Sequence, residues 1–298
     1  MRSLAARSLA QLGQASAEAI SALLSALHDE NARVRSDAAR SLAQLGQASA
    51  EVITALLTAL HDQDAGMRSI AAWSLAQLGQ ASAEVISALL TALHDENARV
   101  RSDAARSLAR LGQASPEVIS ALLTALHDEN AGVRSTAAWG LGQLGQASPE
   151  AISALLTALH DQNAIVHSYA AQSLGQLGQA SPEVSAGLRE ALHKAKDRST
   201  RRDSVGFLGQ IGQGDEATLN ALWRGLLDSD NDVRAASAQT LAQLGRQIST
   251  ITQGLEAKLV EAILDPKFEK SDNTGRRAYD YAYDGLWFLV IGGEIENR

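Results

Sequence analysis

The 298-residue sequence contains no cysteine, and only 4% of its residues are aromatic. Without cysteine no disulfide framework can form, so we expect a cytoplasmic protein. The scarcity of aromatic residues indicates a thin core of Leu, Val, Ile and Ala. No apolar run approaches the ~18–20 residues that a membrane-spanning helix needs, so no membrane segment is predicted.

Groups that would indicate catalysis are also lacking. The sequence has no G-x-x-x-x-G-K-[ST] phosphate-binding loop, no evident Ser-His-Asp arrangement and no pair of carboxylates isolated in an apolar setting. The net charge of -8 argues against general nucleic-acid binding. We therefore expect a protein that is not an enzyme and needs no cofactor or metal.

What the sequence does have is a repeat of 33 residues. The tripeptide Leu-Gly-Gln recurs at this spacing from Leu12 to Leu177, and related tripeptides follow at Ile211 and Leu244. A fixed period of this length is typical of solenoids, in which each unit buries its apolar face against the next. The unbroken period favours one continuous array, although the length alone would suggest about two domains.

One repeat, Gln113 to Gly145, predicts two helices joined by a short turn. Ser115 is a natural N-cap and Pro116 suits the first helical position. Asp128 or Asn130 can cap the second helix, and a glycine ends it because glycine adopts the left-handed conformation without steric cost. The apolar stripes of the two helices are Val118, Ile119, Leu122, Leu123 and Leu126, then Val133, Ala137, Ala138, Leu141 and Leu144.

The pattern L-x-x-L, then Asp, then V-R-x-x-A-A-x-x-L-x-x-L-G resembles the HEAT repeat in its bacterial, HEAT-like form. The resemblance covers roughly residues 1–264. It implies an all-α, right-handed α-solenoid of about eight two-helix repeats. In such solenoids the second helices line the concave surface, where partners usually bind.

The two ends of the sequence depart from the repeat. Residues 2–13 match residues 35–46, so the sequence is expected to start inside a second helix. We hypothesise that the chain is the tail of a longer protein, or that a partner or a second copy covers this end.

Residues 265–298 are expected to form a capping segment with a last helix from Arg276 to Ile291. This segment holds Phe268, Tyr279, Tyr281, Tyr283, Trp287 and Phe288. The stretch RRAYDYAYDGLW, Arg276 to Trp287, resembles the tail that closes HEAT arrays in bacterial NACHT-type NTPases, which are NLR-like signalling and defence proteins. Any NTPase module would have to lie upstream of Met1, because the chain has no phosphate-binding loop.

Two regular sets of polar residues are predicted to be structural. One histidine per repeat recurs at the end of the first helix. Packed helices lie ~8–10 Å apart, too far for neighbours in this set to share a zinc ion with ligands at about 2 Å. One arginine per repeat follows the turn and is expected to pair with turn carboxylates or carbonyls of neighbouring repeats. The two sets are His28, His61, His94, His127, His160 and His193, and Arg35, Arg68, Arg101 and Arg134, with His167 in the next arginine position.

The five similar repeats differ mainly at four positions of the second helix, spaced i, i+4, i+7 and i+11. This spacing places them on one face of a helix. Variable position one holds Arg33, Gly66, Arg99, Gly132 and Ile165; position two Asp37, Ile70, Asp103, Thr136 and Tyr169; position three Arg40, Trp73, Arg106, Trp139 and Gln172; position four Gln44, Gln77, Arg110, Gln143 and Gln176.

Variation confined to one surface is typical of a binding face, and Trp and Arg are favoured as interface anchors. Two alternatives to a binding face stay open: each Trp lies against an Arg of a neighbouring repeat as a cation–π pair, or the alternation reflects duplication in two-repeat units. The candidate binding face comprises Arg33, Asp37, Arg40, Ile70, Trp73, Arg99, Asp103, Arg106, Arg110, Thr136, Trp139, Tyr169 and Gln172.

The sequence therefore predicts a non-catalytic scaffold that binds a protein or peptide on its concave second-helix face. The NACHT-like tail suggests the sensor or scaffold region of a bacterial NLR-like protein. The alternative is a bilin-handling protein, because HEAT-like repeats also build phycobilin lyase subunits. Nucleic acid is a third possibility, disfavoured by Asp37, Asp103 and the overall charge.

Overall fold

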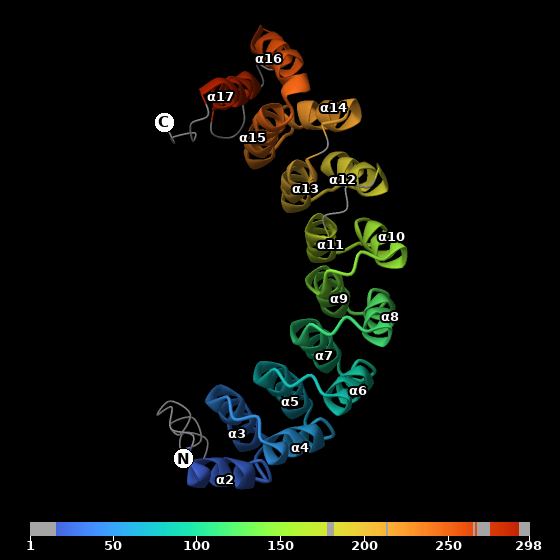
Figure 1. Cartoon of the computed structure of the whole chain (residues 1–298), viewed down its shortest axis with the longest axis vertical. Coiled ribbons are helices and arrows are strands. Elements are labelled where there is room, and N and C mark those ends of the chain that lie inside the picture. The colour runs from blue at the N-terminus through green and yellow to red at the C-terminus, as the bar shows by residue number, and fades with distance from the viewer. Residues whose placement is uncertain (1–15, 178–181, 213, 265, 267–274, 292–298) are drawn as a thin grey trace. The chain divides into compact units, whose positions relative to one another are not determined.

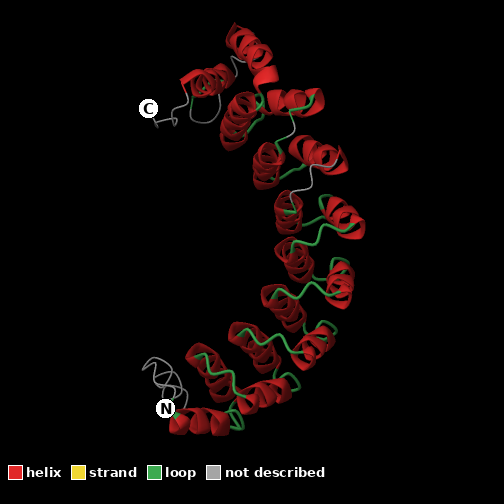
Figure 2. Cartoon of the chain, viewed as in Figure 1, coloured by secondary structure: helices red, strands yellow, loops and turns green. Residues whose placement is uncertain are grey.

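The computed structural model describes the chain except for residues 1–15, 178–181, 213, 265, 267–274 and 292–298. Its described residues form helices joined by short turns, with no strand among them (Figure 2). They group into two compact units, residues 1–146 and 147–298. The expected second helix at residues 1–13 lies outside the described residues.

The first unit contains four helix pairs, each with a shorter first helix and a longer second helix. The first helices are α2 (Ala17–Ala26), α4 (Ala50–Ala59), α6 (Ala83–Ala92) and α8 (Pro116–Ala125). The second helices are α3 (Ala32–Leu45), α5 (Ala65–Leu78), α7 (Ala98–Leu111) and α9 (Ala131–Leu144).

The second unit also consists of helix pairs, but their lengths vary more. Its first helices are α10 (Pro149–Ala158), α12 (Pro182–Lys194), α14 (Glu216–Gly225) and α16 (Ser249–Leu264). Its second helices are α11 (Ala164–Gln176), α13 (Arg198–Ile211), α15 (Asn231–Gln247) and α17 (Ala278–Ile291). The prediction of an all-α solenoid of two-helix repeats is confirmed.

The helix ends follow the chemistry of the repeat. The Ser115 side chain accepts a hydrogen bond from the Val118 backbone N–H and so caps α8. Asn130 caps α9 by accepting from the Gly132 N–H, which leaves Asp128 for another role. Gly145 ends α9 with φ of +67°, a conformation that costs glycine no steric strain.

The core of the first unit is a row of leucines between the two layers of helices. Each first helix and each second helix contributes one leucine that is at most 1% exposed: Leu23, Leu56, Leu89 and Leu122, then Leu42, Leu75, Leu108 and Leu141. Buried alanines, such as Ala104 and Ala105, let successive second helices pack closely. First helices of successive repeats touch much less, so the unit bends with its second helices on the inner side (Figure 1).

The last helix, α17, packs against α15 and α16 in the second unit. Gly285 lies so close to α15 that a Cβ there would be 3.2 Å from the Ala238 carbonyl oxygen. Tyr281 is buried, whereas the side chain of Tyr283 is exposed. Phe268 lies outside the described residues, and the side chains of Tyr279, Trp287 and Phe288 are likewise not described. The division at Leu264 into an array and a capping segment stays a prediction.

Candidate protein-binding face

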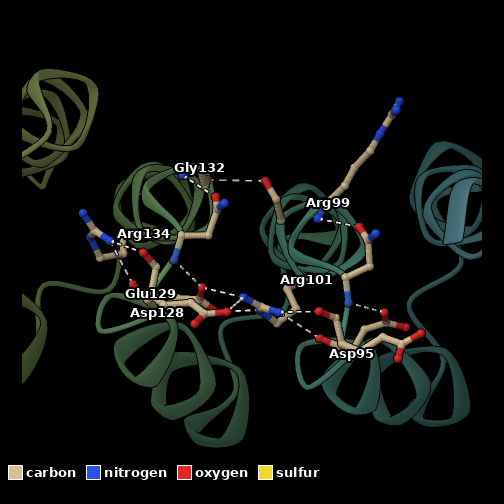
Figure 3. A network of polar contacts seen from close by, with 11 residues as sticks. Asp95, Arg99, Arg101, Asp128, Glu129, Gly132 and Arg134 are labelled. Carbon is tan, nitrogen blue, oxygen red and sulfur yellow. Dashed lines mark hydrogen bonds and ion pairs between the residues drawn. The ribbon is translucent and has the colours of Figure 1, made fainter.

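The regular arginines of the first unit link each repeat to the next. Arg101 donates from Nε and Nη2 to the two carboxylate oxygens of Asp128 in the following repeat, at 2.7 and 2.8 Å (Figure 3). Its Nη1 donates to the carbonyl oxygens of Asp95 and Glu96 in its own turn, at 3.0 and 3.1 Å. One side chain thereby fixes its own turn and the next turn together.

The same geometry recurs in the preceding repeats. Arg35 pairs with Asp62 and Arg68 with Asp95, each through two hydrogen bonds of 2.7 or 2.8 Å. We call these three pairs the Arg–Asp ladder. The structural role predicted for the regular arginines is confirmed, because each guanidinium of the ladder donates to a carboxylate of the next turn and to two backbone carbonyls of its own turn.

The ladder also sets the ionisation of its carboxylates. Burial acts to raise the pKa of Asp128, but hydrogen bonds from the Arg101 guanidinium and from the Asn130 backbone N–H lower that pKa below its ordinary value. Hydrogen bonds from Arg35 and Arg68 likewise keep the pKa values of Asp62 and Asp95 low against the effect of burial. The ladder is therefore fully charged at neutral pH.

The regular histidines do not form a metal site in the described structure. All six histidines at the ends of the first helices are exposed to solvent. Within the described ranges, no group of three or more His, Cys, Asp or Glu side chains is placed to hold a metal ion.

The variable positions of the second helices divide into buried and exposed sets. At position two, Asp37 is 2% exposed and Thr136 is 4% exposed. The Ser69 hydroxyl donates to the Asp103 carboxylate, and Ser102 and Thr136 share a hydrogen bond of 2.9 Å between their hydroxyl oxygens. Position two thus lies at the joint between successive second helices, with Ile70 and Tyr169 half-buried.

Sequence reasoning did not foresee the serines that join position two. Ser69 and Ser102 each precede their partners by one repeat and one residue. Ser168 contacts Asp203 in the same way, at an oxygen–oxygen distance of 3.0 Å, across a repeat that is one residue longer. The place is not enough to predict the contact, because the equivalent Ser135 instead donates to the Gly132 carbonyl oxygen of its own helix, at 3.0 Å.

Positions one, three and four are open to solvent. Arg33, Arg99, Arg106 and Arg110 are exposed, and the Arg40 side chain is 41% exposed. The side chain of Arg99 extends away from the Arg–Asp ladder (Figure 3). Trp73, Trp139 and Gln172 are half-buried. We call the exposed part of these three positions the second-helix face.

The two tryptophans of this face are seated in the helix layer with part of each ring accessible. The Arg106 guanidinium lies 6.0 Å from the ring centre of Trp139 in the next repeat, within the range of a cation–π contact. The predicted cation–π alternative is therefore confirmed for Trp139. It does not remove the ring from the surface, since both residues remain accessible to a partner.

The surface depressions described in the second unit do not lie on the second-helix face. They have volumes of 440, 350 and 560 Å³ and open to solvent beside the first helices α12 and α14. Their linings include Arg189, which contributes to two of them, and His167, which lies in the third. No helix in the described part of the chain combines the length and apolar character of a membrane span.

The sequence profile of HEAT repeats matches residues 1–76, 53–123, 86–175 and 152–242. The chain belongs to the HEAT-repeat family. No curated protein matches its sequence.

Three solved structures show how far the likeness extends. YibA of Escherichia coli is 21% identical, with a TM-score of 0.63 over 93% of this chain and 94% of YibA. A chain of the AP-3 complex is 16% identical, with a TM-score of 0.68 over 95% of this chain and 53% of that chain. Importin beta is 13% identical, with a TM-score of 0.61 over 93% of this chain and 41% of importin beta. At these identities the likeness shows the HEAT-repeat fold alone.

Proposed function

We propose that this HEAT-repeat protein is a non-catalytic scaffold that binds a protein or peptide on the second-helix face. The observation that carries the proposal is the location of the differences between repeats. Caps, turns and the Arg–Asp ladder are repeated almost unchanged, whereas the exposed positions of the second helices alternate between Arg and Trp. A purely structural array has no need for such variation on one accessible surface.

The chemistry of this face suits protein recognition. Trp and Arg are enriched among residues whose truncation costs binding energy, because each offers a large contact area together with directional donors. Trp139 and Arg106 are held in place by their mutual contact, which reduces the entropy lost when a partner binds. The fold is shared with a chain of AP-3, which is described as a complex, and the proposal extends that kind of role to this chain.

A sharper version assigns the scaffold to a bacterial NLR-like protein. It rests on the resemblance of Arg276–Trp287 to the tail that closes HEAT arrays in NACHT-type NTPases. In this version the array senses or positions a partner for an NTPase. Co-purification with an NTPase from the native cell, or discovery of an NTPase module in the same gene product, supports it; isolation of the face-bound partner with neither contradicts it.

The proposed binding face can be tested with paired tryptophan variants. Tagged wild-type protein, Trp73→Ala/Trp139→Ala and the control Trp223→Ala are used to capture proteins from native cell extract. Trp223 is half-buried on the first helix α14, so its replacement removes the same ring away from the second-helix face. We expect a protein that is captured by wild type and by the control but lost with the double variant, while the helical circular dichroism is unchanged.

Identical captured proteins from all three baits would contradict this assignment of the face. A large fall in melting temperature for the double variant alone would show that the indoles serve the scaffold rather than a partner.

A further inference from the structure

The charges on the second-helix face of the first unit are unequal in their exposure. Five arginines and two aspartates occupy the variable positions of α3, α5, α7 and α9, and these four helices carry no other acidic residue. The side chain of Asp37 is only 3% exposed and that of Asp103 is 27% exposed. The arginines reach solvent, so the accessible surface is basic although the whole chain has a net charge of -8.

The two aspartates are engaged within the helix layer. Asp37 lies 3.7 Å from an Nη1 of Arg40, one turn further along α3, and Asp103 lies 3.9 Å from Nε of Arg99 on α7. Asp103 also accepts the hydrogen bond from Ser69. These contacts orient two arginines but neutralise only part of the positive charge.

The arginines are gathered in two clusters separated by an apolar step. Arg33 and Arg40 come from α3, and Arg99, Arg106 and Arg110 come from α7. Between them α5 presents Trp73 with uncharged neighbours at the other variable positions. Packed helices are ~8–10 Å apart, so two steps of the array separate the clusters by ~16–20 Å.

On the basis of the proposed protein-binding function, we infer that this face binds an acidic segment of a partner protein. Carboxylates of the segment pair with the arginine clusters on α3 and α7, and an apolar or aromatic residue between them contacts Trp73. An extended peptide advances ~3.3 Å per residue, so the two acidic groups are about five or six residues apart. Arginine suits this partner because its planar donors bind a carboxylate through two hydrogen bonds.

A nucleic acid fits the same surface less well. Each strand of duplex DNA carries one phosphate for every ~3.4 Å of helix axis, and this regular series of charges requires a continuous basic track. Here the α5 step carries no exposed cation, because Arg68, its one basic residue, is buried in the Arg–Asp ladder. The basic surface is therefore interrupted between the two arginine clusters.

Selection from a random library of 12-residue peptides displayed on phage tests the inference. The bait is the full chain, and the expected winners carry two acidic groups about five or six residues apart with an apolar residue between them. A synthetic peptide from the winning set is then titrated by fluorescence anisotropy. Binding is expected to weaken at least ten-fold in Arg99→Glu/Arg106→Glu/Arg110→Glu, and also in Arg33→Gln/Arg40→Gln, which tests the other cluster with a milder change.

The matched control is Lys194→Glu/Lys196→Glu/Arg224→Glu, which makes the same change in net charge at exposed residues of the second unit. It is expected to bind the peptide within two-fold of wild type. Neutral or basic winners, an empty selection, or equal losses in the control and the α7 variant would overturn the inference. Tighter binding of a mixed-sequence single-stranded oligonucleotide than of any selected peptide, with loss in the α7 variant, would overturn it in favour of nucleic acid.

This result is separable from the test of the proposed function. If a partner is captured through Trp73 and Trp139 but is not displaced by the acidic peptide, the proposed binding face is supported and the acidic-segment inference is rejected. If no protein is captured through the second-helix face, the proposed function and the acidic-segment inference are both rejected.

Discussion

The two units use one repeat pattern but join their second helices differently. In the first unit the Ser74 and Ser107 hydroxyls donate to the Ala39 and Ala72 carbonyl oxygens of the preceding second helix, at 3.2 and 2.9 Å. In the second unit Phe207 occupies the equivalent position in α13 and lies against Gly175 of α11. The larger Phe207 on α13 fits because Gly175 on α11 has no side chain, so the two helices still pack closely.

The turns show the same contrast. The first unit has the Arg–Asp ladder, whereas His167 replaces the arginine at one point of the second unit. Its Nδ1 lies 3.5 Å from Asp197 Oδ2, and its Nε2 contacts the Asp161 carbonyl oxygen. The next repeat returns to the pattern, with Arg201 bound to Asp228 through two hydrogen bonds of 2.9 Å. The helix pair therefore keeps its fold where the arginine that links one turn to the next is replaced by a histidine.

Breaking the ladder in the first unit is expected to have the largest effect on stability. Arg101→Met removes both bonds to Asp128 and leaves a mostly buried carboxylate without its hydrogen-bonded cation, which costs about 3 kcal/mol. Urea unfolding followed by circular dichroism measures the loss, and hydrogen exchange locates it in residues 17–146. The matched change His167→Met is expected to cost less than Arg101→Met, because the 3.5 Å between His167 Nδ1 and Asp197 Oδ2 is too long for a strong hydrogen bond. Equal costs for the two variants would contradict the contrast.

The packing difference is tested at Gly175. A Cβ at this residue would lie 2.2 Å from Phe207 Cδ1 and 3.0 Å from Phe207 Cβ. Gly175→Ala is therefore expected to destabilise the second unit by about 2 kcal/mol, and adding Phe207→Ser should recover most of the loss. The control is Gly206→Ala, whose Cβ meets nothing within 4 Å and should stabilise α13 by up to about 1 kcal/mol. Additive effects of the first two changes would refute a size match.

Acid should weaken the ladder through its carboxylates. The pKa values of Asp62, Asp95 and Asp128 are below the ordinary 3.8 in the folded state. Their contribution is therefore complete above the unfolded-state pKa and is lost as pH falls through the folded-state values. We expect amide protection in the first unit to decline below about pH 4, and Arg101→Met to flatten this decline. A first unit whose stability does not change between about pH 5 and pH 2 would argue against the ladder's role.

The smallest effect on stability is expected on the second-helix face. Arg106→Gln removes the cation–π contact with Trp139 and should cost only about 0.5–1 kcal/mol. The same change should weaken partner binding more than it weakens folding, because the guanidinium is exposed. Thermal melts and the captured-protein assay give the two readings. A loss of several kcal/mol would place Arg106 in the scaffold instead of the binding face.

Most of the fold could be predicted from the sequence because its causes are local and repeated. Ser115 and Asn130 cap helix N-termini with their side chains. Gly145 ends a helix because it has no side chain to oppose a positive φ. The pairing of Arg101 with a turn carboxylate was also foreseeable, since the arginine and the turn aspartate recur at the same spacing throughout the first unit.

The depth of burial across the second helix could not be predicted from the helix alone. The spacing i, i+4, i+7 and i+11 places Asp37 and Arg40 on one stripe, yet Asp37 is buried and Arg40 is accessible. The difference comes from the neighbouring helix, which covers one edge of the stripe. For the same reason, the sequence alone predicts that Asp37 and Asp103 offset the positive charge of the neighbouring arginines. In the structure these aspartates are less exposed than the arginines, so the surface charge is mainly positive.

The central claim, that a protein partner occupies the second-helix face, is tested most directly by photo-crosslinking. A photoreactive amino acid is placed at Gln77, which is exposed on this face, and, as the control, at Thr124, which is exposed on the first helix α8. After irradiation in native cell extract, the account predicts one cross-linked protein from position 77, absent from position 124 and reduced by Trp73→Ala/Trp139→Ala. Cross-links of equal yield from both positions, or from position 124 alone, would contradict it.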